Sequence, residues 1–346
     1  MKAHLIKCSY SDPDRSALKE AGRALREGKI VVFPTETVYG VGANALDQNA
    51  CEEIFRIKNR PQDNPLIVHV SSYEMAESVC TLDPGIRKGL SHFWPGPLTI
   101  IAPSGAAICK AARAGLPTVG VRFPSAPVAR MLIEEAGVPI AAPSANISTR
   151  PSITDPAHAL EEFSGKVDFV IASGKSPLGI ESTVIDLTSK GIRLLRAGST
   201  PVEDLEKVFG DIEVTEAARG VATEERPLSP GTKYLHYSPV TPLYLVAEEQ
   251  MKSMGHDPRF SEYVFICSSQ AGQGITNRKI VLGSDSDLSA VASRLFSALR
   301  ELDSMGARGG FIHMFPEHGI GLAIGNRIRK ASRPLTGEIL ATLVRS

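Results

Sequence analysis

The chain of 346 residues is poor in cysteine, and its few cysteines follow no metal-binding or disulfide pattern. The five are Cys8, Cys51, Cys80, Cys109 and Cys267, an odd number without a Cys-x-x-Cys spacing. A disulfide framework and a structural zinc site are therefore not expected. Reduced thiols in a cytoplasmic protein are the plain interpretation.

Long apolar runs and an excess of charge of one sign are also missing. No stretch of about 20 apolar residues occurs, and Lys2, His4 and Lys7 interrupt the N-terminus, so neither a membrane span nor a signal peptide is expected. Lys plus Arg and Asp plus Glu both number 38, which argues against binding of nucleic acid through overall charge. A local basic surface stays open.

What the sequence does contain is an alternation of apolar strands and amphipathic helices. Hydrophobic residues make up 42% and charged residues 22%, as in globular proteins, and the length favours two domains. Helical spacing is present over 15–28, 49–57, 73–80, 84–92 and 127–137. Strands are predicted over 30–33, 66–70, 98–102, 118–123, 139–142, 167–172, 182–187 and 192–195. Residues 1–204 are therefore predicted to form a domain built on a twisted, mixed α/β sheet.

The second half of the chain divides into a linker and a smaller domain. Residues 205–240 have no strong period and are predicted to be a linker or lid. Residues 241–346 resume a βα pattern, with strands over 242–247, 263–267, 279–282 and 310–314 and a helix over 287–304. This pattern predicts a three-layer, Rossmann-like parallel α/β domain.

Candidate matches to common phosphate-binding and catalytic motifs do not have the required spacing. Gly174-Lys175-Ser176 has Phe169 where a P-loop requires glycine. The glycines at 319, 321 and 325 do not fit a dinucleotide fingerprint, and no His-Glu-x-x-His or Gly-x-Ser-x-Gly occurs.

Small polar groups and cations instead gather where predicted strands and helices end. Lys58 and Arg60 end a predicted helix, and Ser144 and Asn146 follow a predicted strand. Together they suit a polyphosphate, although cations at a helix end are commonly solvated partners of its dipole. Arg122, at a strand end, suits a carboxylate or is a surface arginine.

Similar alternatives hold for the other candidates. Thr35 lies on a loop after a strand and either binds a small ligand or caps a turn. His69 faces a ligand or is a structural histidine. Ser182 and Arg196 likewise either bind a ligand or have a structural role.

These segments, taken together and in order, resemble the YrdC-like threonylcarbamoyl-AMP synthases. The resemblance rests on residues 34–40, Lys58-x-Arg60, residues 93–99 and Ser144-x-Asn146, with residues 229–239 resembling the linker of the long, two-domain members. It implies that L-threonine, bicarbonate or CO2 and ATP give threonylcarbamoyl-AMP and pyrophosphate, the first step of tRNA threonylcarbamoyladenosine modification. The implied enzyme is a nucleotidyltransferase, and its product passes to a tRNA threonylcarbamoyltransferase.

The resemblance also assigns roles to individual residues. It implies that threonine is bound by Thr35, His69, Arg122, Ala142 and Ser182. It implies that ATP is bound by Lys58, Arg60, Thr118, Ser144, Asn146, Arg150, Arg196, Gly231 and Tyr237. The segment holding His236 and Tyr237 would act as a lid, and Mg2+ would be carried by the ATP phosphates without protein ligands.

The residue inventory agrees with such a reaction, which needs positioning and charge stabilisation more than a protein nucleophile. Other interpretations remain. One is a tRNA- or double-stranded-RNA-binding protein of the same fold without adenylate chemistry, and a weak tRNA contact is compatible with either. Another is a carbamoyltransfer enzyme of the hydrogenase-maturation type, whose cysteine clusters are missing here. A third is a regulatory nucleotide-binding module.

Overall fold

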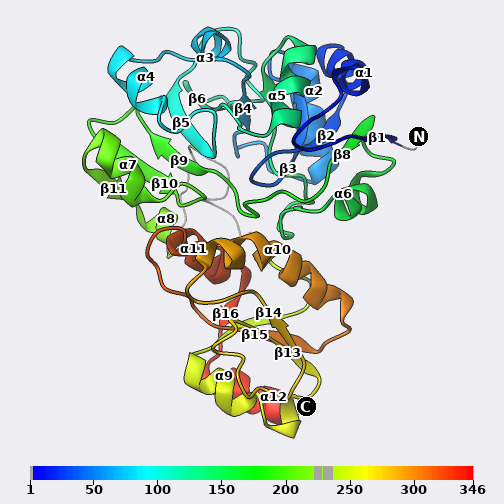
Figure 1. Cartoon of the computed structure of the whole chain (residues 1–346), viewed down its shortest axis with the longest axis vertical. Helices are drawn as coiled ribbons and strands as arrows, with labels where there is room; N and C mark the ends of the chain where they lie inside the picture. The colour runs from blue at the N-terminus through cyan, green and yellow to red at the C-terminus, as the bar shows by residue number, and fades with distance from the viewer. Residues whose placement is uncertain (1–2, 222–227, 229–236, 346) are drawn as a thin grey trace.

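The protein consists of two lobes stacked along its long axis (Figure 1), as seen in a computed structural model that describes residues 3–221, 228 and 237–345. A mixed sheet forms the core of the first lobe and a parallel sheet forms that of the second. The predicted fold class is confirmed. Among the residues described, every helix is too short or too polar to span a bilayer.

The first lobe is built on an 11-stranded sheet with the order β1-β8-β2-β3-β7-β4-β6-β5-β9-β10-β11. Its strands are β1 (His4–Lys7), β2 (Val31–Pro34), β3 (Tyr39–Asn44), β4 (Ile67–His69), β5 (Leu98–Pro103), β6 (Thr118–Arg122), β7 (Ile140–Ala141), β8 (Phe169–Ala172), β9 (Thr183–Asp186), β10 (Ile192–Arg196) and β11 (Ile212–Val214). Its helices are α1 (Arg15–Arg26), α2 (Gln48–Lys58), α3 (Tyr73–Val79), α4 (Pro84–Leu90), α5 (Pro127–Ala136), α6 (Pro156–Phe163), α7 (Val202–Phe209) and α8 (Glu216–Arg219).

Helices on both faces of this sheet bury alternate residues of its strands. Phe33 and Val31 of β2 pack with α1 and α5, whereas Val32 belongs to the larger core on the other face. Helix α1 begins where the Asp14 side chain accepts a hydrogen bond from the Ser16 amide at 2.9 Å. Leu18 is among the α1 residues buried against the sheet.

The second lobe has a fully parallel five-stranded sheet with the order β14-β13-β15-β12-β16. Its elements are β12 (Leu243–Leu245), α9 (Glu248–Met254), η1 (Pro258–Phe260), β13 (Tyr263–Cys267), β14 (Lys279–Val281), α10 (Leu288–Ser304), β15 (Gly309–Ile312), α11 (Gly321–Ala331), β16 (Arg333–Pro334) and α12 (Gly337–Arg345). Figure 1 shows α10 and α11 between this sheet and the first lobe, and α9 and α12 on the far face.

The expected linker over 205–240 needs a correction in its first part. Helix α7, strand β11 and helix α8 occupy much of 202–219, and β11 pairs in parallel with β10 at the edge of the large sheet. The repeat of hydrophobic residues is weak here because β11 has only three residues and α8 only four. Elements this short cannot show a repeat in the sequence. Residues 222–227 and 229–236, including Gly231 and His236, lie outside the described residues.

The two lobes meet through α10 and α11. Gly179 approaches α10 so closely that an added Cβ would lie 2.4 Å from the Ser293 Cα. Arg300 of α10 forms an ion pair of 2.6 Å with Glu162 of α6. The cleft described next lies in the first lobe beside this interface.

Candidate active site

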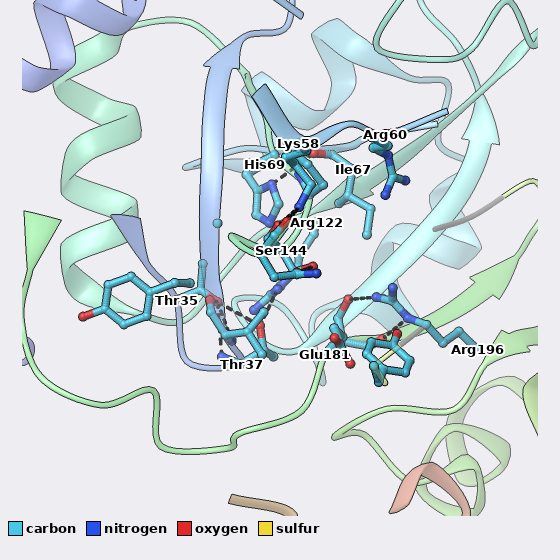
Figure 2. A pocket seen from close by; sticks show the side chains of 18 of the residues that line it. Thr35, Thr37, Lys58, Arg60, Ile67, His69, Arg122, Ser144, Glu181 and Arg196 are labelled. Atoms are coloured by element: carbon cyan, nitrogen blue, oxygen red, sulfur yellow. Dashed lines mark hydrogen bonds between the residues drawn. The ribbon is translucent and has the colours of Figure 1, made fainter. Parts of the chain in front are cut away.

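A cleft opens where several strands and loops of the first lobe end. Its lining combines apolar side chains with a set of convergent polar and charged groups, as is usual for a ligand-binding site. Most of the predicted site residues line it (Figure 2), namely Thr35, His69, Arg122, Ala142, Ser182, Lys58, Arg60, Ser144, Asn146, Arg196 and Tyr237.

Lys58 ends α2 with its side chain turned inward, and it is 1% exposed. Asn59, which follows, adopts the left-handed conformation (φ 50°) and ends the helix, so that Arg60 also reaches the cleft. The Lys58 ammonium donates to the carbonyl oxygens of Ser144, at 2.6 Å, and Asn146. The two motifs therefore form one unit, in which Lys58 shapes the Ser-x-Asn loop as well as facing the cleft.

The loop from Ser144 to Arg150 is held by further hydrogen bonds. The Ser144 hydroxyl donates to the Asn146 Oδ1 at 2.5 Å, and the Asn146 side-chain Nδ2 donates to the Arg150 carbonyl at 2.9 Å. The Ile147 amide donates to Glu162 at 3.0 Å. A loop fixed at so many points is preorganised for a ligand.

Burial weakens the proton affinity of the cations that face the cleft. It lowers the pKa of Lys58 well below its ordinary value, and the nearby Arg60 lowers it further. Burial also lowers the pKa of Arg196 to about 10. A bound polyanion stabilises the charged form of such side chains strongly, because charge interactions are stronger in a site with little water.

Arg196 and Ser182 form the wall near the second lobe. The Arg196 Nε donates to the Ser182 carbonyl at 3.1 Å, and its Nη2 donates to the Ser182 hydroxyl at 3.0 Å. The same hydroxyl contacts the Thr99 hydroxyl at 2.7 Å. The Ser182 side chain is thereby fixed in the cleft.

Arg122 ends β6 and is paired with a carboxylate that the sequence analysis assigned no role. Its Nη2 lies 2.7 Å from the Glu36 Oε1, and its Nη1 donates to the Thr37 hydroxyl at 2.8 Å. Burial alone would raise the pKa of Glu36, but Arg122 outweighs it and the pKa is lowered. The Thr35 hydroxyl lies 2.8 Å from that of Thr37, so this end of the cleft is a connected polar network.

His69 is buried at the end of β4 and lines the cleft. Burial and the neighbouring Arg122 lower its pKa to about 3, so the imidazole is neutral at physiological pH. Its Nδ1 lies 3.1 Å from the Ile67 carbonyl oxygen. A neutral ring offers hydrogen bonds without charge.

Two predicted ATP contacts lie elsewhere in the described residues. Thr118 begins β6, four residues before Arg122 and hence ~13 Å along the strand. Arg150 forms an ion pair of 3.1 Å with Asp303 of α10. Neither residue lines the cleft.

Other lining residues carried no assigned role in the sequence analysis, most notably Thr37 and Glu181. Both are polar residues inside or directly beside the motif segments, which is the signal that could have found them, and the structure buries both. Figure 2 shows Thr35 and Thr37 on the left of the cleft and Arg60, Arg196 and Glu181 toward the right. The cations Lys58, Arg60 and Arg196 line the cleft together with Arg122, whose charge is paired with that of Glu36. Such a set of cations suits an anionic ligand.

Two family models together cover most of the chain. Residues 23–198 match the family model described as "Telomere recombination", and residues 200–333 match that of the threonylcarbamoyl-AMP synthase C-terminal domain. The chain is 41% identical to a threonylcarbamoyl-AMP synthase of Pyrococcus abyssi over 91% of this chain and 94% of that protein. It is 38% identical to the Bacillus subtilis protein of the same name over 94% of each.

A solved structure is similar over the same extent. The crystal structure of Pyrococcus abyssi Sua5 complexed with L-threonine superposes with a TM-score of 0.89 at 38% identity. The match covers 96% of this chain and 99% of that one, so it includes both lobes.

Proposed function

The chain belongs to the two-domain threonylcarbamoyl-AMP synthase family, and we propose that its cleft converts L-threonine, bicarbonate or CO2 and ATP into threonylcarbamoyl-AMP and pyrophosphate. The chain is accordingly an enzyme, and the proposed class is that of the nucleotidyltransferases. The observation that carries the proposal is that four cationic side chains line one cleft. Arg122 suits one carboxylate, while Lys58, Arg60 and Arg196 suit a polyphosphate.

The proposed threonine end is the network around Arg122. Its guanidinium would bind the threonine carboxylate in two-point geometry. The Thr35 and Ser182 hydroxyls, the Ala142 backbone and the neutral His69 would complete the contacts. Because His69 carries no charge near neutral pH, it would not repel the threonine ammonium group.

The chemistry then needs two bond-forming steps. The threonine ammonium group first loses a proton to solvent, and the neutral nitrogen then forms a bond to the carbon of CO2 while one C–O π bond gives its electron pair to oxygen. The nitrogen loses a second proton to solvent, which leaves a carbamate. Bicarbonate would enter the same step after it takes up a proton and loses water to give CO2. A carbamate oxygen attacks the α-phosphorus of ATP, and the bond from that phosphorus to the bridging oxygen breaks, so that pyrophosphate leaves with the electron pair.

Charge builds up on the leaving pyrophosphate, where Lys58, Arg60 and Arg196 would stabilise it. The Ser144 to Asn146 loop would fix the nucleotide beside the carbamate. ATP would enter as its Mg2+ complex, with the ion held by phosphate oxygens and water. Glu181, which lines the cleft, and Glu36, which lies behind Arg122, are each already paired with a buried arginine, and so they are poor candidates to hold it.

The reaction product would pass to a tRNA threonylcarbamoyltransferase. Thr118 and Arg150 could contact ATP only at the margin of the cleft or after a local rearrangement. We propose that Tyr237, which is buried and lines the cleft, contacts the nucleotide. Gly231 and His236 lie outside the described residues.

The test is a pyrophosphate-release assay with purified protein, MgATP, bicarbonate and one amino acid at a time. We expect release with threonine and little with valine or alanine, since the pocket must bind the threonine side chain. Release that is equal for all amino acids, or that needs none, would refute the proposal. RNA binding without any release would favour the alternative function.

A further inference from the structure

Glu181 lies on the cleft wall with both oxygens of its buried carboxylate engaged. The Ser152 hydroxyl donates to its Oε1 at 2.5 Å, and the Arg327 Nε donates to its Oε2 at 2.9 Å. Ser152 belongs to the first lobe, whereas Arg327 lies on α11 of the second, 146 residues away in the sequence. The second lobe thus reaches directly to the wall of the cleft.

Arg327 is fully buried and makes a second bond to the first lobe. Its side chain is 0% exposed, and its Nη1 donates to the Ala197 carbonyl at 2.8 Å. Glu181 immediately precedes Ser182, and Ala197 immediately follows Arg196. One guanidinium therefore ties together the two segments that carry the paired Ser182 and Arg196 of the cleft.

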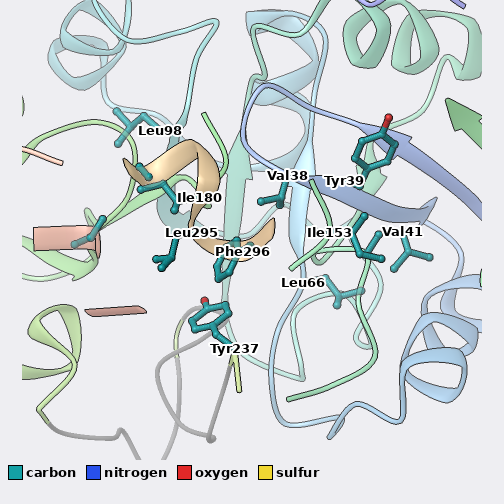
Figure 3. Close-up of a cluster of buried hydrophobic side chains, with 14 of the residues drawn as sticks. Val38, Tyr39, Val41, Leu66, Leu98, Ile153, Ile180, Tyr237, Leu295 and Phe296 are labelled. Atoms are coloured by element: carbon teal, nitrogen blue, oxygen red, sulfur yellow. The ribbon is translucent and has the colours of Figure 1, made fainter. Parts of the chain in front are cut away.

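The same guanidinium also faces Tyr237, the described residue that lines the cleft from the start of the second lobe. Its central carbon lies 5.3 Å from the centre of the Tyr237 ring. That ring is packed on Phe296 of α10 at 5.1 Å between centroids, and Figure 3 shows the two rings together. Tyr237 is buried, and side chains of α10 and α11 pack against its ring.

Stability alone explains this arrangement poorly. Burying an arginine and a glutamate costs desolvation energy, and apolar side chains of similar volume often stabilise such a position as well or better. What an arginine adds is direction, because its planar fork bonds two acceptors at once in fixed geometry. Here the two acceptors flank cleft residues.

We propose that Arg327 is a positioning residue for the reaction: it holds Glu181 and the backbone at Ala197 so that Ser182, Arg196 and Tyr237 have the geometry that the substrates require. The second lobe is on this view a part of the active site. The inference rests on the proposed function, since it assigns a role within that reaction.

The test compares Arg327→Met with Arg329→Met. Arg329 lies on the same helix and also bonds the first lobe, through the Arg219 carbonyl at 2.9 Å. Its partners Arg219 and Glu317 do not line the cleft, whereas Glu181, the partner of Arg327, does. We expect R327M to lower kcat/KM for threonine-dependent pyrophosphate release by about 10- to 100-fold, as small misplacements of catalytic groups do, and R329M to stay near wild type. Equal activities of R327M and R329M would overturn the proposal.

R327M leaves the Glu181 charge buried without its partner, and so it is at risk of not folding. The double variant Glu181→Gln with R327M removes both charges and keeps the test open. We expect it to fold and to lose at least as much kcat/KM as E181Q alone, since Arg327 also holds the Ala197 backbone. The combined loss should be smaller than the product of the two single losses, because both residues act through the same contact. Wild-type activity in the double variant would overturn the proposal.

A pH profile separates positioning from a purely structural role. Burial raises the pKa of Glu181, but Arg327 and Arg196 outweigh it and lower that pKa, and the Ser152 hydroxyl lowers it further. Tyr237 is the other titratable group that interacts with Glu181. Loss of Arg327 should raise the pKa of Glu181, and the acid limb of kcat/KM should move to higher pH in R327M but not in R329M. An acid limb that stays in place in R327M would overturn the proposal.

The wild-type protein keeps the two hypotheses apart. If wild type releases pyrophosphate with threonine and the R327M and R329M variants have equal activities, the role of Arg327 is refuted and the proposed function stands. Failure of wild type to release pyrophosphate with threonine refutes the proposed function itself, and the role of Arg327 with it.

Discussion

The Lys58 ammonium donates a hydrogen bond of 2.6 Å to the carbonyl oxygen of Ser144, across 86 residues of sequence. Two motifs that are individually unremarkable thereby become one structure. The lysine both supplies charge to the cleft and sets the shape of the loop that faces it. Its replacement should therefore affect ATP chemistry in two ways at once.

Lys58→Met should lower kcat/KM for ATP by about a hundredfold, the effect of removing one preorganised electrostatic contact. Stability should change much less, because methionine fills a similar volume and removes a costly buried charge. The matched control is Arg56→Met on the same helix, where the arginine is exposed and pairs with Glu53. Steady-state kinetics and thermal unfolding check both, and a K58M enzyme as active as R56M would remove Lys58 from the site.

ATP binding should become weaker as the pH rises on the alkaline side. Burial lowers the pKa of Lys58, so the free protein loses this proton at a lower pH than an exposed lysine would. The phosphates favour the charged form, and binding above the lowered pKa should therefore take up a proton. Calorimetry in buffers of different ionisation enthalpy measures that uptake. Proton uptake that is unchanged in K58M would contradict this account.

Arg122→Gln should raise the threonine KM by about 10- to 100-fold, because hydrogen bonds to charged groups contribute ~1.5–3 kcal/mol each. The KM for ATP should change little, since the polyphosphate cations are other residues. The double variant with Glu36→Gln avoids an unpaired buried carboxylate and serves as the control for folding. Equal increases in both KM values would show that Arg122 does not serve the threonine end.

Glu36 should make the protein less stable in acid. Its pKa is lowered from the ordinary 4.5 because Arg122 outweighs the opposing effect of burial. A lowered pKa means that the unfolded chain binds the proton more readily, so the stabilisation is complete above about pH 4.5 and is lost as the pH falls through the folded value. Urea unfolding over this range should give a flatter profile for Glu36→Gln than for wild type. Parallel profiles would contradict the assignment.

Much of the fold could be predicted from sequence because its strands are short apolar runs with clear boundaries. Strand β3 was missed, since Gly40 and Gly42 interrupt the expected pattern. The structure explains Gly42: an added Cβ would lie 2.7 Å from the Phe33 ring. Such close packing between neighbouring strands leaves no periodic signal.

The candidate site was predictable to the extent that its residues fall at the ends of strands and helices. The partners that fix them were not, because they come from distant parts of the chain. Nothing in the sequence pairs Arg122 with Glu36, and nothing assigns Arg327 of the second lobe to Glu181 of the first. These pairs arise only when the sheet and the interface between the lobes have formed.

The central claim is that one cleft joins three substrates, and isotope incorporation tests it most directly. Purified protein, MgATP, threonine and carbon-labelled bicarbonate are incubated, and the adenylate fraction is analysed by chromatography and mass spectrometry. The account predicts an adenylate that contains both threonine and the labelled carbon, formed in equal amount with pyrophosphate. Pyrophosphate release that yields only AMP or an unlabelled threonyl-adenylate would contradict it.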